Sequence, residues 1–135
     1  MFAMDRQWWQ THGDEVIASF GGARYSINNM AAKYNVVKLP PAFKHYGNSG
    51  AACIAMAAQG GASRIVLLGF DCQHTGGKAH WHGNHPKGLG NAGGVDKWQE
   101  KFAELARDIA GIDVINATKE TALNCWPRKP LEDLL

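Results

Sequence analysis

The apolar run at residues 65–70, Ile-Val-Leu-Leu-Gly-Phe, constrains the fold more than any other part of this chain. Its length and composition fit a strand buried on both faces, as in a parallel sheet. An alanine-rich segment precedes it, beginning at the helix-capping sequence Asn48-Ser49-Gly50 and ending at the glycine pair 60–61. A helix that leads directly into a buried strand predicts an α/β protein.

The remaining segments continue the alternation of strand and helix. Such alternation predicts one Rossmann-like domain over residues 1–135, with a mainly parallel sheet and helices on both faces. We expect the first helix to turn Trp8, Val16, Ile17 and Phe20 inward. In chain order the expected elements are a strand end at 2–4, a helix at 8–20, a strand at 23–27, a helix at 29–34, a strand at 36–39, a helix at 48–59, a strand at 65–70, a helix at 95–110, a strand at 113–118 and short helical pieces at 121–125 and 130–135.

Composition places the chain among ordinary globular proteins. Its 135 residues are 45% hydrophobic and 19% charged, enough for a core that needs neither disulfides nor a metal. The net charge of +2 is too small to indicate a nucleic-acid polymer as partner. Three cysteines without a C-x-x-C motif predict reduced thiols, and the start of the chain does not resemble a signal peptide. We therefore expect a cytoplasmic protein with no membrane partner.

Polar residues follow each expected strand. The carboxyl ends of parallel strands share one edge of a sheet, and open α/β sheets bind ligands at that edge. We therefore expect a single binding crevice there. The candidate ligand-binding residues are Asp5, His45, Asn48, Ser49, Gly50, Asp71, Gln73, His74, Lys78, His80, Trp81, His82 and Asn116.

Two of these candidates have an ordinary structural alternative. The helix start at Asn48-Ser49-Gly50 could be only a cap, or its free N–H groups and dipole could hold a phosphate. Asp71 could only cap a turn, but a carboxylate directly after the central strand is also suited to ribose hydroxyls or base N–H groups. We favour the ligand-binding role for Asp71.

The loop at residues 71–85 holds four of the chain's six histidines. Imidazolium and ammonium groups donate strong hydrogen bonds to phosphate oxygens, and an indole ring can stack on a base. We interpret the loop as a basic lid over a phosphorylated ligand, formed by Lys78, His80, His82 and His85, with Trp81 facing the base.

A metal site is the alternative for the same loop. The spacing of His80, His82 and His85 allows three imidazoles to converge on Zn²⁺, with Asp71 or water as fourth ligand. The lysines at 78 and 87 would oppose a cation, and neither an H-E-x-x-H motif nor a cysteine pair is present. We therefore favour the lid and expect no metal.

Nucleophilic catalysis has little support in the sequence. Cys72 follows Asp71, whose negative charge should raise the pKa of the thiol, and Cys53 lies inside the alanine-rich helix. Ser49 and His45 lack an identifiable third group to orient the imidazole. We leave catalytic residues unassigned.

The sequence His45-Tyr46-Gly47-Asn48-Ser49-Gly50, the alanine-rich helix and the segment 61–71 together resemble the Rossmann-like domain of the 6-hydroxymethylpterin diphosphokinase MptE-like proteins. The string His-Trp-His-Gly-Asn-His-Pro at 80–86 resembles bacteriophage members of that group, sometimes called norphogenetic proteins. The resemblance covers nearly the whole chain and implies a phage protein in the host cytoplasm. The family's glycine-rich phosphate-handling segment lies upstream of the position matching Phe2, so the chain is N-terminally short relative to the family.

The resemblance and the residues together predict a nucleotide-binding protein. We expect it to sequester a phosphorylated nucleotide signal of host immunity, an anti-defence role, without turning the ligand over. The alternative is a diphosphokinase-like or glycosyltransferase-like enzyme acting on a nucleotide or pterin-type substrate, with Asp5 or Asp71 holding Mg²⁺ and a histidine as base. So short a sheet also leaves an edge that a second copy could cover, which predicts a homo-oligomer.

Overall fold

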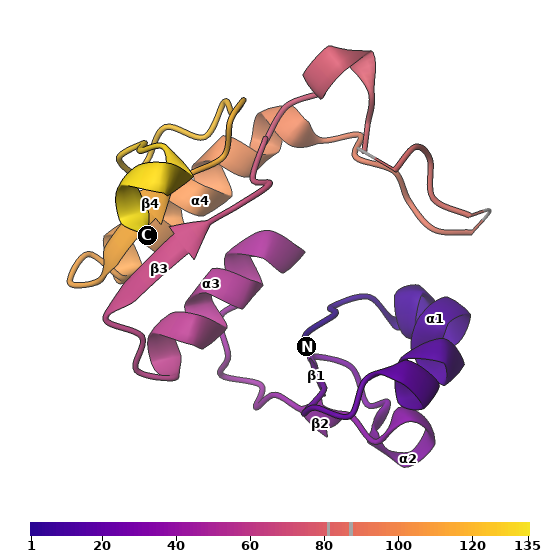
Figure 1. The fold of residues 1–135 in the computed structure, drawn as a ribbon. Helices are drawn as coiled ribbons and strands as arrows, with labels where there is room; N and C mark the ends of the chain where they lie inside the picture. Colours follow the sequence, from indigo (N-terminus) through magenta and orange to yellow (C-terminus); the bar gives the residue numbers. More distant parts are fainter. Residues whose placement is uncertain (81, 87) are drawn as a thin grey trace. The chain divides into compact units, whose positions relative to one another are not determined.

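The computed structural model describes residues 1–135 except Trp81 and Lys87, and except the side chain of Ala31 (Figure 1). The chain divides into two compact units. The N-terminal unit comprises Met1–Lys44 and Pro86–Leu89, and the C-terminal unit comprises His45–His85 and Gly90–Leu135. Both units mix helices with short parallel strand pairs, so the α/β class is confirmed, while the single-domain boundary stays a prediction.

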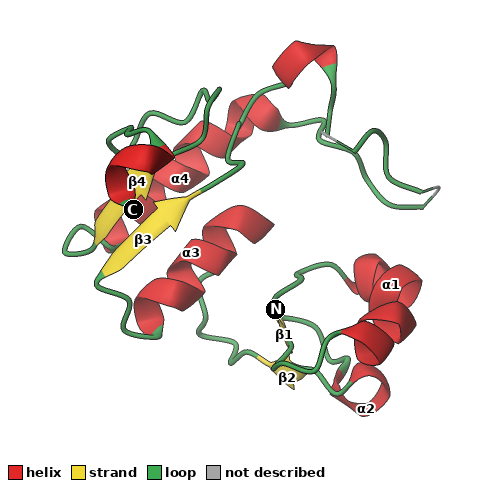
Figure 2. Cartoon of the chain, in the orientation of Figure 1, coloured by secondary structure: helices red, strands yellow, loops and turns green. Residues whose placement is uncertain are grey.

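The N-terminal unit is built on a two-stranded parallel sheet. Tyr25 pairs with Val37, and Phe2 adds an isolated parallel bridge to Tyr25 on the other side. The strand end expected at residues 2–4 is thus present as a single bridge. The elements are α1 (Arg6–Ser19), β1 (Tyr25–Ser26), α2 (Ala31–Tyr34) and β2 (Val37–Lys38) (Figure 2).

Trp9 is the centre of the core of the N-terminal unit. Its side chain is fully buried, its ring stacks on that of Tyr34 with 6.1 Å between centroids, and its indole N–H donates to the carbonyl of Ala3 at 2.9 Å. Trp8, which the sequence predicts to face inward, packs against this core but is only partly buried, so Trp9 is the tryptophan at the centre. Consequently α1 buries positions 9, 13 and 16.

Gly13 explains why α1 presents the face with positions 9, 13 and 16 to the core. A Cβ at position 13 would lie 2.4 Å from the ring of Tyr34, so only glycine lets the helix approach that ring. Ile17, which the sequence predicts to face inward, is 43% exposed. Phe20, also predicted to face inward, follows the end of α1 in an extended conformation and is 38% exposed.

The Gly13→Ala variant tests this close approach. Alanine is the better helix former by about 1 kcal/mol, whereas overpacking a core costs about 1–3 kcal/mol. Because Tyr34 is fully buried and cannot withdraw, we expect a net loss of stability in urea unfolding. The matched control is Gly21→Ala, where an added Cβ meets nothing within 4 Å. A Gly13→Ala variant more stable than wild type would contradict this account of the helix face.

The C-terminal unit contains one β-α-β crossover. Its two strands pair in parallel from Arg64↔Asp113 to Leu67↔Asn116, and Arg128 adds a parallel bridge to Asn116 on the far side. The elements are α3 (Ser49–Gln59), β3 (Arg64–Leu67), α4 (Trp98–Asp108) and β4 (Asp113–Asn116), with 3₁₀ turns at Thr75–Gly77, Val95–Lys97 and Leu131–Leu134.

Two predictions for the C-terminal unit need correction. The strand expected at 65–70 ends at Leu67, and it is not covered on both faces, since Val66 is 37% and Leu68 is 56% exposed. Gly69 follows with a φ of +72°, which turns the chain away from an extended path. The helical piece expected at 121–125 is absent, because the hydroxyl of Thr121 donates to the Phe70 carbonyl and accepts from the Leu123 amide.

None of the described helices is long and apolar enough to cross a membrane.

Candidate functional site

The chain leaving β3 is joined by hydrogen bonds to the chain leaving β4. The Phe70 amide donates to the hydroxyl of Thr118 at 2.9 Å, and the hydroxyl of Thr121 donates to the Phe70 carbonyl at 2.6 Å. The Ala122 amide donates to the carbonyl of Asp71 at 2.8 Å. These bonds fix the rim at the carboxyl ends of the two strands. Sequence reasoning placed Thr118 in the polar cluster after the last strand but missed Thr121 and both sets of contacts, since hydrogen bonds between distant loops leave no periodic pattern.

The side chains of Asp71 and Asn116 shape this rim. The carboxylate of Asp71 accepts from the Thr75 hydroxyl at 2.7 Å, and the amide of Gln73 donates to the same hydroxyl at 3.4 Å. Asn116 is buried, and its carbonyl oxygen accepts from the Thr118 amide at 3.0 Å. These three candidates therefore already hold local turns.

The start of α3 lies at the same end of the unit as Asp71. A Cβ on Gly50 would meet the ring of Phe70 at 2.9 Å, so the helix start packs beside the residue that precedes Asp71. The side chain of Asn48 accepts from the Ala51 amide at 3.0 Å, which is ordinary capping, while Ser49 is exposed.

His45 lies in the turn that leads into α3. Its Nδ1 accepts from the Gly47 amide at 3.0 Å, and the Lys101 ammonium group donates to the Gly47 carbonyl at 2.7 Å. The Tyr46 hydroxyl donates to Asp108 at 2.7 Å, so two bonds tie this turn to α4. The contacts of His45 are thus those of a turn residue.

Two histidines hold the backbone of Ala92, which is buried. Nε2 of His74 lies 2.7 Å from the Ala92 carbonyl oxygen, and the Ala92 amide donates to Nε2 of His80 at 3.3 Å. His74 must therefore carry a proton on Nε2, whereas His80, when neutral, carries it on Nδ1. This clasp closes the long connection between β3 and α4. Sequence reasoning did not identify Ala92, because an alanine among glycines carries no signal of a binding role.

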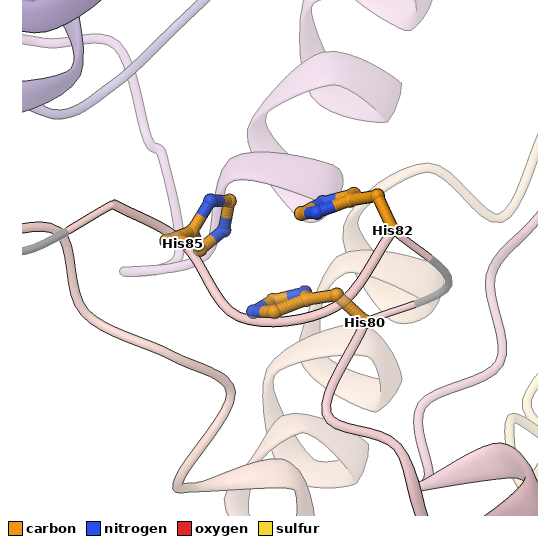
Figure 3. Close-up of side chains that lie close together, drawn as sticks. All are labelled: His80, His82 and His85. Atoms are coloured by element: carbon orange, nitrogen blue, oxygen red, sulfur yellow. The ribbon is translucent and has the colours of Figure 1, made fainter.

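His80, His82 and His85 form a compact cluster in the same connection, and their rings face one another (Figure 3). The rings of His80 and His82 are parallel with centroids 5.1 Å apart, and the His85 ring lies 4.3 Å from that of His80. One nitrogen from each residue lies within 4.8 Å of the other two. The convergence that the metal alternative requires is therefore present.

Desolvation lowers the pKa of His80 below 6.5, and the neighbouring His85, His82 and His74 lower it further. The neutral imidazole is therefore the favoured form of His80 near neutral pH. This property suits a metal ligand better than a cationic lid, because metal-bound imidazole is neutral.

Beside the cluster lies an open pocket of about 470 Å³. Its lining residues include the exposed Lys78 and His82, and His82 is the one member of the cluster that also lines the pocket. The other lining residues are Gly77, Ala79, Gly83 and Asn84.

The structure places all but one of the described site candidates in the C-terminal unit. Asp5 is exposed and directly precedes α1 in the N-terminal unit, so its grouping with the others stays a prediction. Trp81, predicted to face a base, and Lys87 lie outside the described residues. Comparisons with protein-family models, with curated proteins and with solved structures gave no match.

The raised pKa that the sequence predicts for Cys72 is confirmed, but its main cause is burial of the thiol rather than the charge of Asp71. Burial raises the pKa of the Cys72 thiol to about 11, with Cys125 and then Asp71 as smaller contributors. Burial likewise raises the pKa of Cys125 to about 11 and raises that of Cys53. Near neutral pH these thiols are protonated and poorly nucleophilic.

Alkylation kinetics test this statement. A rise of the thiol pKa from 9.0 to about 11 should make iodoacetamide react with folded Cys72 about a hundredfold more slowly at pH 8 than with the urea-unfolded chain. The rate should increase as the pH approaches the raised pKa. Peptide mass spectrometry assigns the modification to each cysteine. Equal rates at Cys72 in the folded and unfolded chain would contradict the burial of this thiol.

Proposed function

We propose that the protein binds a phosphorylated, nucleotide-like small molecule in the pocket of the β3–α4 connection and holds it without chemical change. The observation that carries this proposal is the pocket wall formed by Lys78 and His82. Lysine and histidine side chains both supply hydrogen-bond donors for phosphate oxygens. The volume of about 470 Å³ falls within the range of small-molecule sites.

The position of the pocket in the chain supports the same function. The pocket-lining residues follow the carboxyl end of β3, which is where open α/β sheets bind ligands. The β3–α4–β4 crossover is the unit that a Rossmann-like fold repeats, and that fold is part of this proposal.

Holding the ligand is favoured over group transfer. Among the described candidates for a nucleophile, Cys72 and Cys125 carry thiols of raised pKa. The carboxylate of Asp71 is engaged with Thr75. The resemblance to phage proteins adds the biological part of the proposal, sequestration of a nucleotide signal of host immunity.

Substitution of Lys78 tests the pocket directly. Loss of one charge-assisted hydrogen bond costs about 1.5–3 kcal/mol, so Lys78→Ala should weaken nucleotide binding roughly tenfold to a hundredfold. The probes are nucleoside mono-, di- and triphosphates and inorganic pyrophosphate, titrated by calorimetry into chelator-treated protein. Higher salt should weaken binding as well, because the pocket is open to solvent.

The matched control is Lys129→Ala, which removes an exposed lysine of the same unit away from the pocket lining. Lys78→Ala binding as tightly as Lys129→Ala would overturn the pocket assignment. Chromatography of the nucleotide after incubation with the protein distinguishes binding from group transfer. Unchanged nucleotide supports binding without turnover. Conversion of the nucleotide to a product would overturn the binding proposal in favour of a transferase.

A further inference from the structure

We propose that His80, His82 and His85 bind one divalent transition-metal ion, and that Zn²⁺ is the best fit. The three side chains come from one six-residue stretch and face a common point (Figure 3). One ring nitrogen from each lies within 4.8 Å of the other two. The site needs no other unit of the chain, because all three residues belong to the C-terminal unit.

A turn brings the three rings together. The Gly83 amide donates to the His80 carbonyl at 3.1 Å, which closes a turn that contains His80 and His82. Gly83 has a φ of +89°, a conformation that other residues rarely adopt. The His85 amide donates to the side chain of Asn91 at 2.9 Å and fixes the far end of the stretch.

The separation of the nitrogens is close to that of a zinc site. Atoms within 4.8 Å of one another lie within about 2.8 Å of a common point, and Zn–N bonds are about 2.0–2.1 Å, so each nitrogen needs to move inward by at most about 0.7 Å. His82 is exposed and His80 and His85 are half-buried, so side-chain rotation can supply this shift.

Three imidazoles select the class of metal. Imidazole suits Zn²⁺, Cu²⁺ and Ni²⁺, whereas Mg²⁺ and Ca²⁺ prefer oxygen ligands. Three protein ligands also leave a fourth position open. His82 lines the pocket as well, so an ion held there would reach the pocket wall and could bind a phosphate oxygen. This last point alone rests on the proposed function.

Metal binding has a structural consequence at Ala92. Nε2 of His80 accepts the Ala92 N–H. An ion bound to Nε2 would occupy the lone pair that accepts the Ala92 N–H. An ion bound to Nδ1 would leave the imidazole proton on Nε2. In both cases Nε2 of His80 could no longer accept a hydrogen bond. Zinc should therefore free the Ala92 amide while the His74 contact to the Ala92 carbonyl remains.

Zinc titration of the untagged full chain, first stripped with a chelator, tests the site. Calorimetry and elemental analysis should give one Zn²⁺ per chain and no response to Mg²⁺. Removing residues that merely orient a metal ligand costs about 10–100-fold in affinity, so loss of a ligand itself in His80→Ala, His82→Ala or His85→Ala should cost more than about a hundredfold.

The matched control is His12→Ala, which removes a histidine outside the cluster and should bind zinc as wild type does. Because His82 is exposed, His82→Gln should keep the fold, which circular dichroism verifies. Nitrogen NMR should show zinc shifting the ring signals of the three cluster residues and the amide signal of Ala92.

Unchanged zinc affinity in His82→Gln would overturn the proposed site. Zinc bound by the thiols of Cys72 and Cys125 would also overturn it, and such binding would persist in all three histidine variants. The zinc titration contains no nucleotide, and the nucleotide titration is made in chelator. Failure of the metal site and failure of the proposed ligand pocket are therefore distinguishable.

Discussion

Parallel pairing of β3 with β4 is the constraint on which the candidate site depends. A chain that leaves the carboxyl end of one parallel strand must return to the amino end of the next, which takes a crossover of a dozen or more residues. The helix α4 makes that return. Residues 68–97 precede the helix that makes the return, and they form the long, mostly irregular connection between β3 and α4 (Figure 2). The fold thus separates the segment that builds the sheet from the segment that holds the candidate site.

The elements that sequence patterns predicted best are those with local causes. The start and end of α3 follow from the capping side chain of Asn48 and from Gly60. Apolar spacing located α1 and α4, with bounds that differ from the predicted ones by up to three residues. The register of α1 could not be predicted, because Gly13 matters only through Tyr34, which lies on another helix. The exposure of Val66 follows likewise from which helices cover β3, a tertiary fact.

The candidate site was predictable in its components but not in its contacts. The spacing of His80, His82 and His85 indicated that three imidazoles could converge, and the structure shows that they do. The bonds of Asp71 to Thr75 and of His80 to Ala92 could not be inferred, because each depends on how an irregular loop folds back. The packing of the rings also bears on the choice between lid and metal, since burial, and then the neighbouring histidines, lower the pKa of His80 and disfavour its protonation.

The hydrogen bond between His74 and the backbone of Ala92 separates the ends of the β3–α4 connection from its interior. His74 lies before most of the loop and Ala92 lies after it, so the contact between them closes the loop. The free energy of this contact offsets the conformational entropy that the loop loses on closure. That entropy grows slowly with length, by about 0.6 kcal/mol for each doubling of the loop. The enclosed segment can therefore gain or lose residues over evolution at little cost to the sheet. Loop length and sheet geometry can therefore change independently of each other in a chain built this way.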